Sequence, residues 1–308
     1  MIRMIPMFGV ARGVYTSVFL AVSAYCNAGF DVLGPIGPTG SLSVFSGDWL
    51  VLGVLGILII IGGLGFIVFN DIFTSRLRGE RQHRLMLHSK VVLMITGGLI
   101  LLGTVGFLIL EHNHLLAGKP FGSQVIDSWF SAVTPRTAGY AVVNYGSAQS
   151  LTKLLTCMLM FIGASPGGTG GGVKTSTVFV LLMTVYSVMV GYNDTVILRK
   201  RVERSTVYKA IALVFFSILL LSIAFIILVI CEQGQHEIDL LFEVVSAFST
   251  TGLSSANTAS LGTVSKAVLI ALMYIGRVGP ISFILTLSTH YGTKDRDTTL
   301  PEGKIMVG

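Results

Sequence analysis

Residues 127–140 read DSWFSAVTPRTAGY, a short amphiphilic segment whose glycine is followed by an aromatic residue. The same sequence pattern appears upstream in residues 17–30, SVFLAVSAYCNAGF, and downstream in residues 241–253, LFEVVSAFSTTGL. Each copy places a phenylalanine nine or ten residues before its glycine. The three glycines stand at positions 29, 139 and 252, and so regular a long spacing indicates a repeated structural unit.

The composition is that of an integral membrane protein. Of the 308 residues, 52% are hydrophobic and only 12% are charged, with a mean hydropathy of +0.80, whereas soluble domains carry about 25% charged residues. The net charge of +6 would suggest nucleic acid as a partner of a soluble chain. Here the basic residues cluster between apolar stretches, as in cytoplasmic loops. We therefore predict that the chain lies in the lipid bilayer and does not bind nucleic acid.

The apolar stretches predict five membrane spans, since a span needs about 20 predominantly apolar residues. The expected spans cover residues 49–73, 91–110, 151–190, 211–231 and 264–287, the third of them broken in its middle. The three glycine segments are expected to be re-entrant. This predicts an all-α, potassium-channel-like protein built from units of span, re-entrant loop and span. The unit boundaries fall at 1–75, 76–198 and 199–308, and the first unit lacks its first span.

The glycine segments are candidates for ion coordination. A short helix that ends in a glycine and an extended turn can present backbone carbonyls to an ion in place of its hydration shell. One such glycine alone is more often an ordinary helix C-cap, but three copies at one period favour a filter. The residues expected to bind K+ are Asn27, Ala28, Gly29, Thr137, Ala138, Gly139, Thr250, Thr251 and Gly252.

The break at residues 163–172 predicts a gate. Loop backbone at membrane depth is tolerated only where protein or a water-filled cavity satisfies its polar groups, so the break should line the ion path. The candidate gate residues are Gly163, Ser165, Gly167, Gly168, Thr169, Gly170, Gly171, Gly172 and Lys174. A phosphate-binding loop is the rival interpretation, but it requires glycine directly before the lysine. Val173 occupies that position.

Arg277 is expected in the middle of the last span, where a charge costs roughly 2.5–3.5 kcal/mol on insertion scales. It should therefore have partners, and we predict that it shapes the electric field of the pore. The alternative is an arginine that snorkels or pairs structurally. Three further charged residues lie at or near the glycine segments and are candidates to tune this field: Asp31, Arg136 and Glu243. The sequence does not rank these three residues by importance.

Five motifs together resemble those of the Trk/Ktr/HKT family of potassium uptake proteins, and within it the KtrB-type membrane subunits. They are NAGFD at 27–31, RTAGY at 136–140, GGTGGGVKT at 167–175, FEVVSAF at 242–248 and RVGP at 277–280. The resemblance covers essentially the whole chain. It implies K+ uptake, with Na+ as a candidate coupling ion and no bound cofactor, across the inner (cytoplasmic) membrane of a bacterium. It also implies a pore of four units in one polypeptide, a gating loop, a homodimer and a separate KtrA-like nucleotide-binding regulatory subunit.

Three alternatives remain open at this point. Only three units are present, so we expect Met1 to be an internal methionine of a longer reading frame, or the chain to be a truncated and inactive fragment lacking roughly 150 residues. An alternating-access cation carrier also uses glycine-broken helices, although carriers usually show two related halves. A membrane enzyme would need convergent ionisable groups within the spans, and the sequence offers few besides Arg277 and Lys174.

Overall fold

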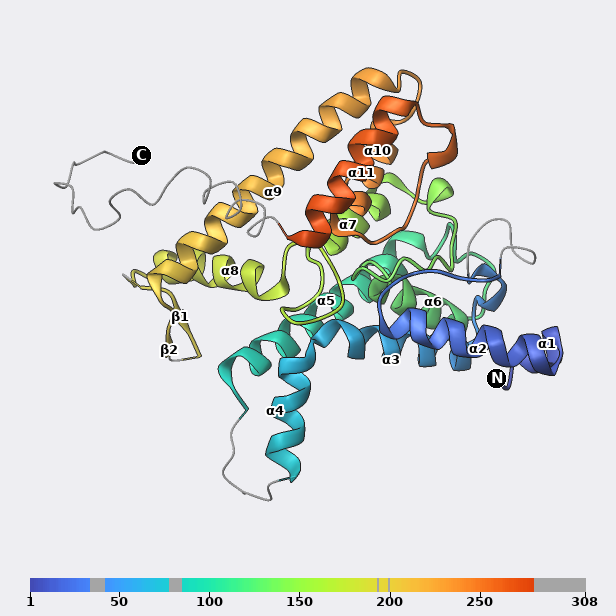
Figure 1. Cartoon of the computed structure of the whole chain (residues 1–308), viewed down its shortest axis with the longest axis horizontal. Helices are drawn as coiled ribbons and strands as arrows, with labels where there is room; N and C mark the ends of the chain where they lie inside the picture. The colour runs from blue at the N-terminus through green and yellow to red at the C-terminus, as the bar shows by residue number, and fades with distance from the viewer. Residues whose placement is uncertain (34–41, 78–84, 193, 199, 280–308) are drawn as a thin grey trace.

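The computed structural model describes residues 1–33, 42–77, 85–192, 194–198 and 200–279, and most of these residues are helical (Figure 1). The α-helices are α1 (Met4–Phe8), α2 (Val10–Tyr25), α3 (Trp49–Leu64), α4 (Phe66–Leu77), α5 (Leu87–Glu111), α6 (Phe121–Val133), α7 (Ser150–Phe161), α8 (Thr175–Met189), α9 (Arg204–Cys231), α10 (Glu237–Ser249) and α11 (Thr263–Val278). A small antiparallel hairpin joins β1 (Val196–Ile197) to β2 (Lys200–Arg201), with Val196 opposite Arg201. The predominantly helical fold predicted from the sequence is confirmed.

Parts of the sequence-based prediction lie outside the described residues. These are the end of the last expected span, from residue 280 to 287, and the final residue of the motif at 277–280.

One order of elements recurs three times in the described residues. A short helix is followed by a glycine, a 3-10 turn and a second helix. The 3-10 turns are η1 (Ser43–Phe45), η2 (Tyr145–Ser147) and η3 (Thr258–Ser260). The three series are α2, Gly29, η1 and α3; α6, Gly139, η2 and α7; and α10, Gly252, η3 and α11. The sequence repeat therefore corresponds to a repeat of structure, and we refer to the three series as the first, second and third units.

Two single helices of the described residues, α5 and α9, are long and apolar enough to cross a membrane. With 25 and 28 residues, they extend about 38 and 42 Å at 1.5 Å per residue, against a hydrocarbon core about 30 Å thick. They precede the second and third units and contain the stretches expected at 91–110 and 211–231.

The expected span at 49–73 is not one straight helix. The axes of α3 and α4 are bent by 92°, at Gly65, whose φ is +86°. A Cβ on Gly65 would lie 2.6 Å from the carbonyl oxygen of Pro166, and the Phe66 amide donates to the Gly167 carbonyl at 3.3 Å. The two helices together are long and apolar enough for a broken span or a re-entrant loop, and the bend was not predicted because apolar length does not specify direction. In Figure 1, α4 points away from the other helices.

The break expected in the stretch 151–190 is confirmed. Helix α7 ends at Phe161 and α8 begins at Thr175. Between them the backbone leaves and returns at nearly the same place, because Ile162 and Val173 form a bridge and the Gly163 amide donates to the Val173 carbonyl at 2.9 Å. We call residues 163–174 the glycine-rich loop.

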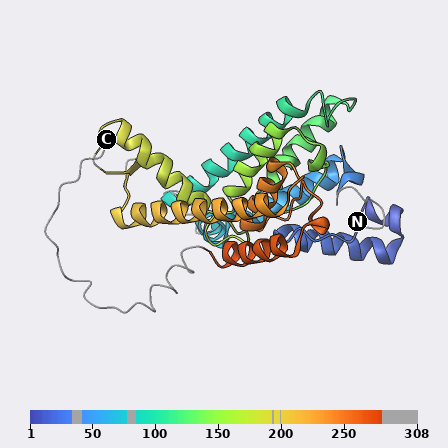
Figure 2. The same ribbon diagram turned by 90° about the horizontal axis from the view of Figure 1, so that it is seen from above.

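The buried apolar side chains form two main clusters. One joins α2, α3 and α6 through residues such as Leu20, Leu52 and Phe130. The other joins α7, α9, α10 and α11 and includes Phe242 and Leu272. The short helices α6 and α10 thus lie inside the protein, which fixes the glycines that follow them. Helix α8 and the start of α9 lie at the end of the molecule opposite α1 and α2 in both views (Figures 1 and 2).

Candidate functional site

Three backbone turns of the same conformation follow the short helices. In each of them, both the glycine and the residue two positions before it have positive φ, a conformation that is uncommon for any residue other than glycine. The φ values are +49° and +70° at Asn27 and Gly29, +68° and +81° at Thr137 and Gly139, and +54° and +88° at Thr250 and Gly252. We call residues 27–29, 137–139 and 250–252 the first, second and third glycine turns.

Each glycine turn is held by the same hydrogen bond. A hydroxyl near the end of the short helix donates to the carbonyl of the residue directly after the glycine. The three bonds run from Ser23 Oγ to Phe30 O at 2.8 Å, from Thr134 Oγ1 to Tyr140 O at 2.7 Å and from Ser246 Oγ to Leu253 O at 2.6 Å. This contact closes the turn and fixes a conformation that would otherwise be costly.

The carbonyl oxygens of the three turns have no hydrogen-bond donor among the described residues. None of the nine accepts a hydrogen bond from the part of the chain that the structure describes, although Asn27, Thr137, Ala138 and Thr251 are almost fully buried. Buried backbone carbonyls are nearly always paired with protein or water. These carbonyls are therefore available to a ligand that is not part of the polypeptide.

The turns lie next to one another in sequence order. A Cβ added to Gly29 would overlap the carbonyl oxygen of Ala138, and a Cβ added to Gly139 would overlap that of Thr251. On the other side of the third turn, no such neighbour exists: the nearest atom to a Cβ on Gly252 is the Cα of Gly139, at 3.9 Å. The three turns therefore form consecutive parts of one ring.

A cavity of about 640 Å³ lies between the first and third turns. Its lining includes Cys26, Asn27 and Phe30 from the first unit and Glu243, Thr251 and Arg277 from the third. The ring formed by the described residues is thus open on this side.

The glycine-rich loop lies directly against the second and third turns. A Cβ on Gly170 would overlap Thr137 Oγ1, and one on Gly171 would overlap Thr250 Oγ1. Both threonine hydroxyls are buried and have no hydrogen-bond partner. Glycine at positions 170 and 171 therefore permits a close approach that any side chain would prevent.

The glycine-rich loop is held by hydrogen bonds from the first and third units and by its own lysine. From the first unit, the Gly62 carbonyl accepts from the Thr169 amide at 3.3 Å. Within the loop, Lys174 Nζ donates to the Gly170 carbonyl at 2.6 Å. From the third unit, Arg277 donates to the Thr169 carbonyl at 2.8 Å. The loop is therefore in a position to respond to movement of the first or the third unit.

The structure brings the predicted residues together, with differences of detail. The nine turn residues share one ring, and the loop residues from Gly163 to Lys174 adjoin it. Arg277 lies in the last turn of α11, exposed and bound to the loop, and not in the middle of a described helix. Arg136 is buried, with 3% of its surface exposed. Its Nη2 donates to Thr96 Oγ1 at 3.2 Å.

Two sets of residues were missed by reasoning from the sequence. The first is the hydroxyls of Ser23, Thr134 and Ser246, which alignment of the three copies would have revealed, since each precedes its glycine by five or six residues. The second is a pair of buried aspartates, Asp127 and Asp239, each three residues before the repeated phenylalanine. Glu243 was named, but its role as acceptor for Ser254 Oγ at 2.6 Å and the Ser255 amide at 3.0 Å was not predicted.

Comparison with known proteins agrees with this geometry. Residues 3–293 match the TrkH family model, described as cation transport protein. The chain is 37% identical to the potassium/sodium uptake protein NtpJ of Enterococcus hirae, over 99% of this chain and 66% of that protein. It is 35% identical to the Ktr system potassium uptake protein B of Bacillus subtilis, over 100% of this chain and 66% of that protein. The chain thus spans about two thirds of the length of these relatives.

The fold is also similar to a solved one. The crystal structure of the potassium transporter TrkH from Vibrio parahaemolyticus superposes with a TM-score of 0.71 at 16% identity, over 91% of this chain and 63% of that chain.

Proposed function

Because the chain belongs to the TrkH family of cation transport proteins, we propose that it carries potassium ions inward across the cytoplasmic membrane of a bacterium. The observation that supports this most is the ring of three glycine turns, whose carbonyls have no donor in the described residues. Carbonyl rings replace the hydration shell of K+ in selective pores. Na+ remains a second candidate ion, because one relative is a potassium/sodium uptake protein.

The units are proposed to act as span, re-entrant pore loop and span, with boundaries at 1–75, 76–198 and 199–308. In this arrangement α2, α6 and α10 are the pore helices and the glycine turns are filter strands. A fourth unit of the same kind is proposed to close the open side of the ring, where the cavity of about 640 Å³ lies between the first and third turns. Homodimerisation and a KtrA-like nucleotide-binding regulatory subunit are proposed from the family resemblance.

The glycine-rich loop is proposed as the gate. It touches the second and third turns, and its contacts to α3, α8 and α11 couple it to the helices that surround the path. An alternating-access carrier is the second candidate mechanism. Three like units arranged around one ring favour a pore, because carriers usually show two related halves.

The filter is tested with Gly139→Ser. A serine at φ +81° is strained by about 1–2 kcal/mol, and its Cβ would displace the Thr251 carbonyl. We expect the preference for K+ over Na+ to fall about tenfold. The assay is uptake of both ions by the complete native gene product in a potassium-uptake-deficient strain.

The matched control for this test is Gly98→Ser, in α5, where an added Cβ meets no atom within 4 Å. This variant should keep the wild-type preference. Unchanged selectivity in Gly139→Ser, at normal membrane levels, would remove the second turn from the filter.

A further inference from the structure

Two lysine–carboxylate pairs with buried carboxylates lie where neighbouring units meet, one with a partly exposed lysine and one with a buried lysine. Asp127 in α6 and Asp239 in α10 occupy the same place in the repeat, three residues before Phe130 and Phe242. Asp127 is fully buried and Asp239 is 9% exposed. A carboxylate in such surroundings needs a partner, and in both cases a lysine supplies it.

At the joint between the first and second units, Asp127 binds the segment that follows η1. Its Oδ1 accepts from the Gly47 amide at 2.8 Å, and its Oδ2 accepts from Ser46 Oγ at 2.7 Å. Lys119 Nζ donates to the same Oδ2 at 2.8 Å and to Ser46 Oγ at 2.7 Å. One carboxylate thus links the short helix of the second unit to the preceding unit.

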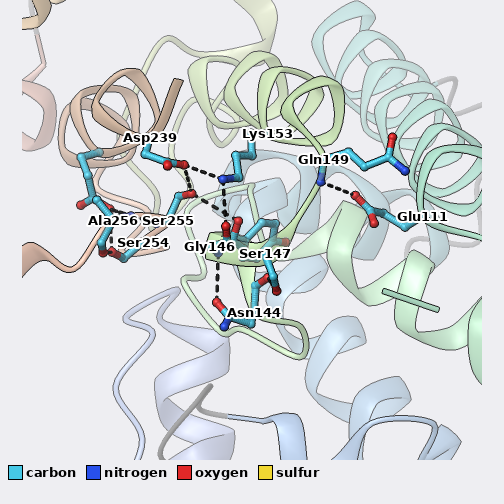
Figure 3. Close-up of polar contacts among 12 residues, drawn as sticks. Glu111, Asn144, Gly146, Ser147, Gln149, Lys153, Asp239, Ser254, Ser255 and Ala256 are labelled. Atoms are coloured by element: carbon cyan, nitrogen blue, oxygen red, sulfur yellow. Dashed lines mark hydrogen bonds and ion pairs between the residues drawn. The ribbon is translucent and has the colours of Figure 1, made fainter. Parts of the chain in front are cut away.

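At the joint between the second and third units, Asp239 likewise accepts hydrogen bonds from a lysine and a serine (Figure 3). Lys153 Nζ from α7 donates to Asp239 Oδ1 at 2.6 Å and to the Gly146 carbonyl at 3.1 Å. Ser255 Oγ donates to Asp239 Oδ1 as well and approaches the Tyr145 carbonyl at 3.2 Å. Ser255 is the third residue after Gly252, and Gly146 is in η2, which follows Gly139.

At the second joint these contacts join the chain that leaves one glycine turn to the chain that leaves the next, whereas at the first joint they join the segment after η1 to the helix that precedes the second turn. Hydrogen bonds between ionised groups are shorter and about twice as strong as neutral ones. The third unit offers a comparison, since Lys266 stands at the same place in α11 as Lys153 in α7. Lys266 donates to the Ala259 carbonyl of η3 at 2.8 Å but remains exposed. The second and third units therefore share the bond from this lysine to the 3-10 turn, and Lys153 in addition pairs with a carboxylate of the next unit.

We propose that Lys119–Asp127 and Lys153–Asp239 are positioning pairs that set the spacing between neighbouring glycine turns and so contribute to ion discrimination. This inference rests on the proposed function, because it assigns the pairs an effect on the filter. The pairs do not touch the ion. They act through Ser46, Gly47, Ser255 and η2, which follow the glycine turns in the first, third and second units.

The experiment compares Lys153→Met and Lys119→Met with the wild type, using the complete native gene product in a potassium-uptake-deficient strain. We expect the K+ over Na+ preference to fall by at least about fivefold, with apparent KM for K+ raised more than the maximal rate is lowered. The charge-reversed double variant Lys153→Asp with Asp239→Lys should recover most of the preference. Lys209→Met, which removes an exposed charge on α9, should behave as wild type.

A second variant keeps the test decisive if Lys153→Met does not fold. Ser255→Ala removes one hydroxyl from the joint and keeps both charges, and it should lower the preference by a smaller factor. If Lys153→Met does not reach the membrane, a wild-type preference in Ser255→Ala overturns the inference.

A wild-type protein without K+ preference would overturn the proposed function, and this inference with it. A wild-type preference that survives both Lys153→Met and Lys119→Met, at normal membrane levels, overturns the inference alone. Purified protein gives a second readout: K+ should raise the wild-type Tm more than Na+ does, and this ion-specific difference should shrink in Lys153→Met.

Discussion

Arg277 and Lys174 bind successive carbonyls of the glycine-rich loop, those of Thr169 and Gly170. A guanidinium offers several donors in a fixed planar arrangement, whereas an ammonium is a compact charge on a flexible stem. The two cations are therefore not equivalent, and each fixes a different point of the loop.

Arg277→Lys should loosen the loop at Thr169. A hydrogen bond contributes about 1 kcal/mol net, so the maximal uptake rate is expected to rise by about fivefold at normal expression. Uptake kinetics measure this effect. Arg201→Lys, at an exposed arginine that pairs with Asp194, is the control. Wild-type kinetics in Arg277→Lys would show that the arginine only snorkels.

At the scale of single residues, the sequence was informative wherever a pattern repeated. Gly29, Gly139 and Gly252 were identified because only glycine recurs at the end of all three copies. Asp127 and Asp239 were not identified, because the first copy has Thr16 at the corresponding position. The lysines that pair with these aspartates also come from different parts of the repeat, Lys119 before α6 and Lys153 in α7. A contact between units leaves no periodic signal in either unit.

The glycine-rich loop is the element whose motion matters most for the proposed gate. Removing residues 168–171 should raise the maximal uptake rate and change the apparent K+ affinity less, because the loop rests against Thr137 and Thr250 without bonding their hydroxyls. Concentration-dependent K+ uptake separates the two quantities. If the shortened protein reaches the membrane but no longer transports, the loop is part of the binding site.

Helices α9 and α11 are joined by Glu232, which follows α9. Its Oε1 accepts from Ser265 Oγ at 2.6 Å and from the Gly262 amide at 2.7 Å, so it caps the start of α11. These two hydrogen bonds lower the pKa of Glu232. A carboxylate whose pKa is lower in the folded state stabilises the fold above its unfolded pKa, about 4.3. This contribution is lost as pH falls through the folded-state value.

Glu232→Gln should therefore lower the Tm of the purified protein at pH 7. The gap between variant and wild type should narrow as pH falls below about 4.3, because the wild-type carboxyl becomes neutral. Thermal unfolding in detergent at several pH values measures it. A gap that stays constant across that range would mean that the charge of Glu232 does not stabilise the fold.

Among the elements, the break between α7 and α8 was predictable and the bend between α3 and α4 was not. The break is marked by six glycines within residues 163–172. The bend depends on one glycine, Gly65, and on a docking partner a hundred residues away. Apolar composition alone made residues 49–73 look like one straight span.

At the scale of the whole molecule, the accessibility of the Cys26 thiol shows whether the ring of glycine turns is open on one side. It is exposed and lines the cavity between the first and third turns. A maleimide should label Cys26 rapidly in residues 1–308 expressed alone, and more slowly in a form of the protein in which a fourth unit closes the ring. Cys231, which is also exposed, is the internal control. Equal labelling of Cys26 in both forms would contradict closure by a fourth unit.

The three glycine turns share a backbone and a closing hydrogen bond, yet they belong to one polypeptide and differ in every other respect. In an assembly of identical chains, one codon change alters every strand around the ion at once. Here a substitution such as Thr137 or Thr250 to serine changes a single strand and leaves the others as they were. Because the three strands are encoded at separate positions of one chain, each can mutate alone, and ion preference can change in steps smaller than a symmetrical pore allows.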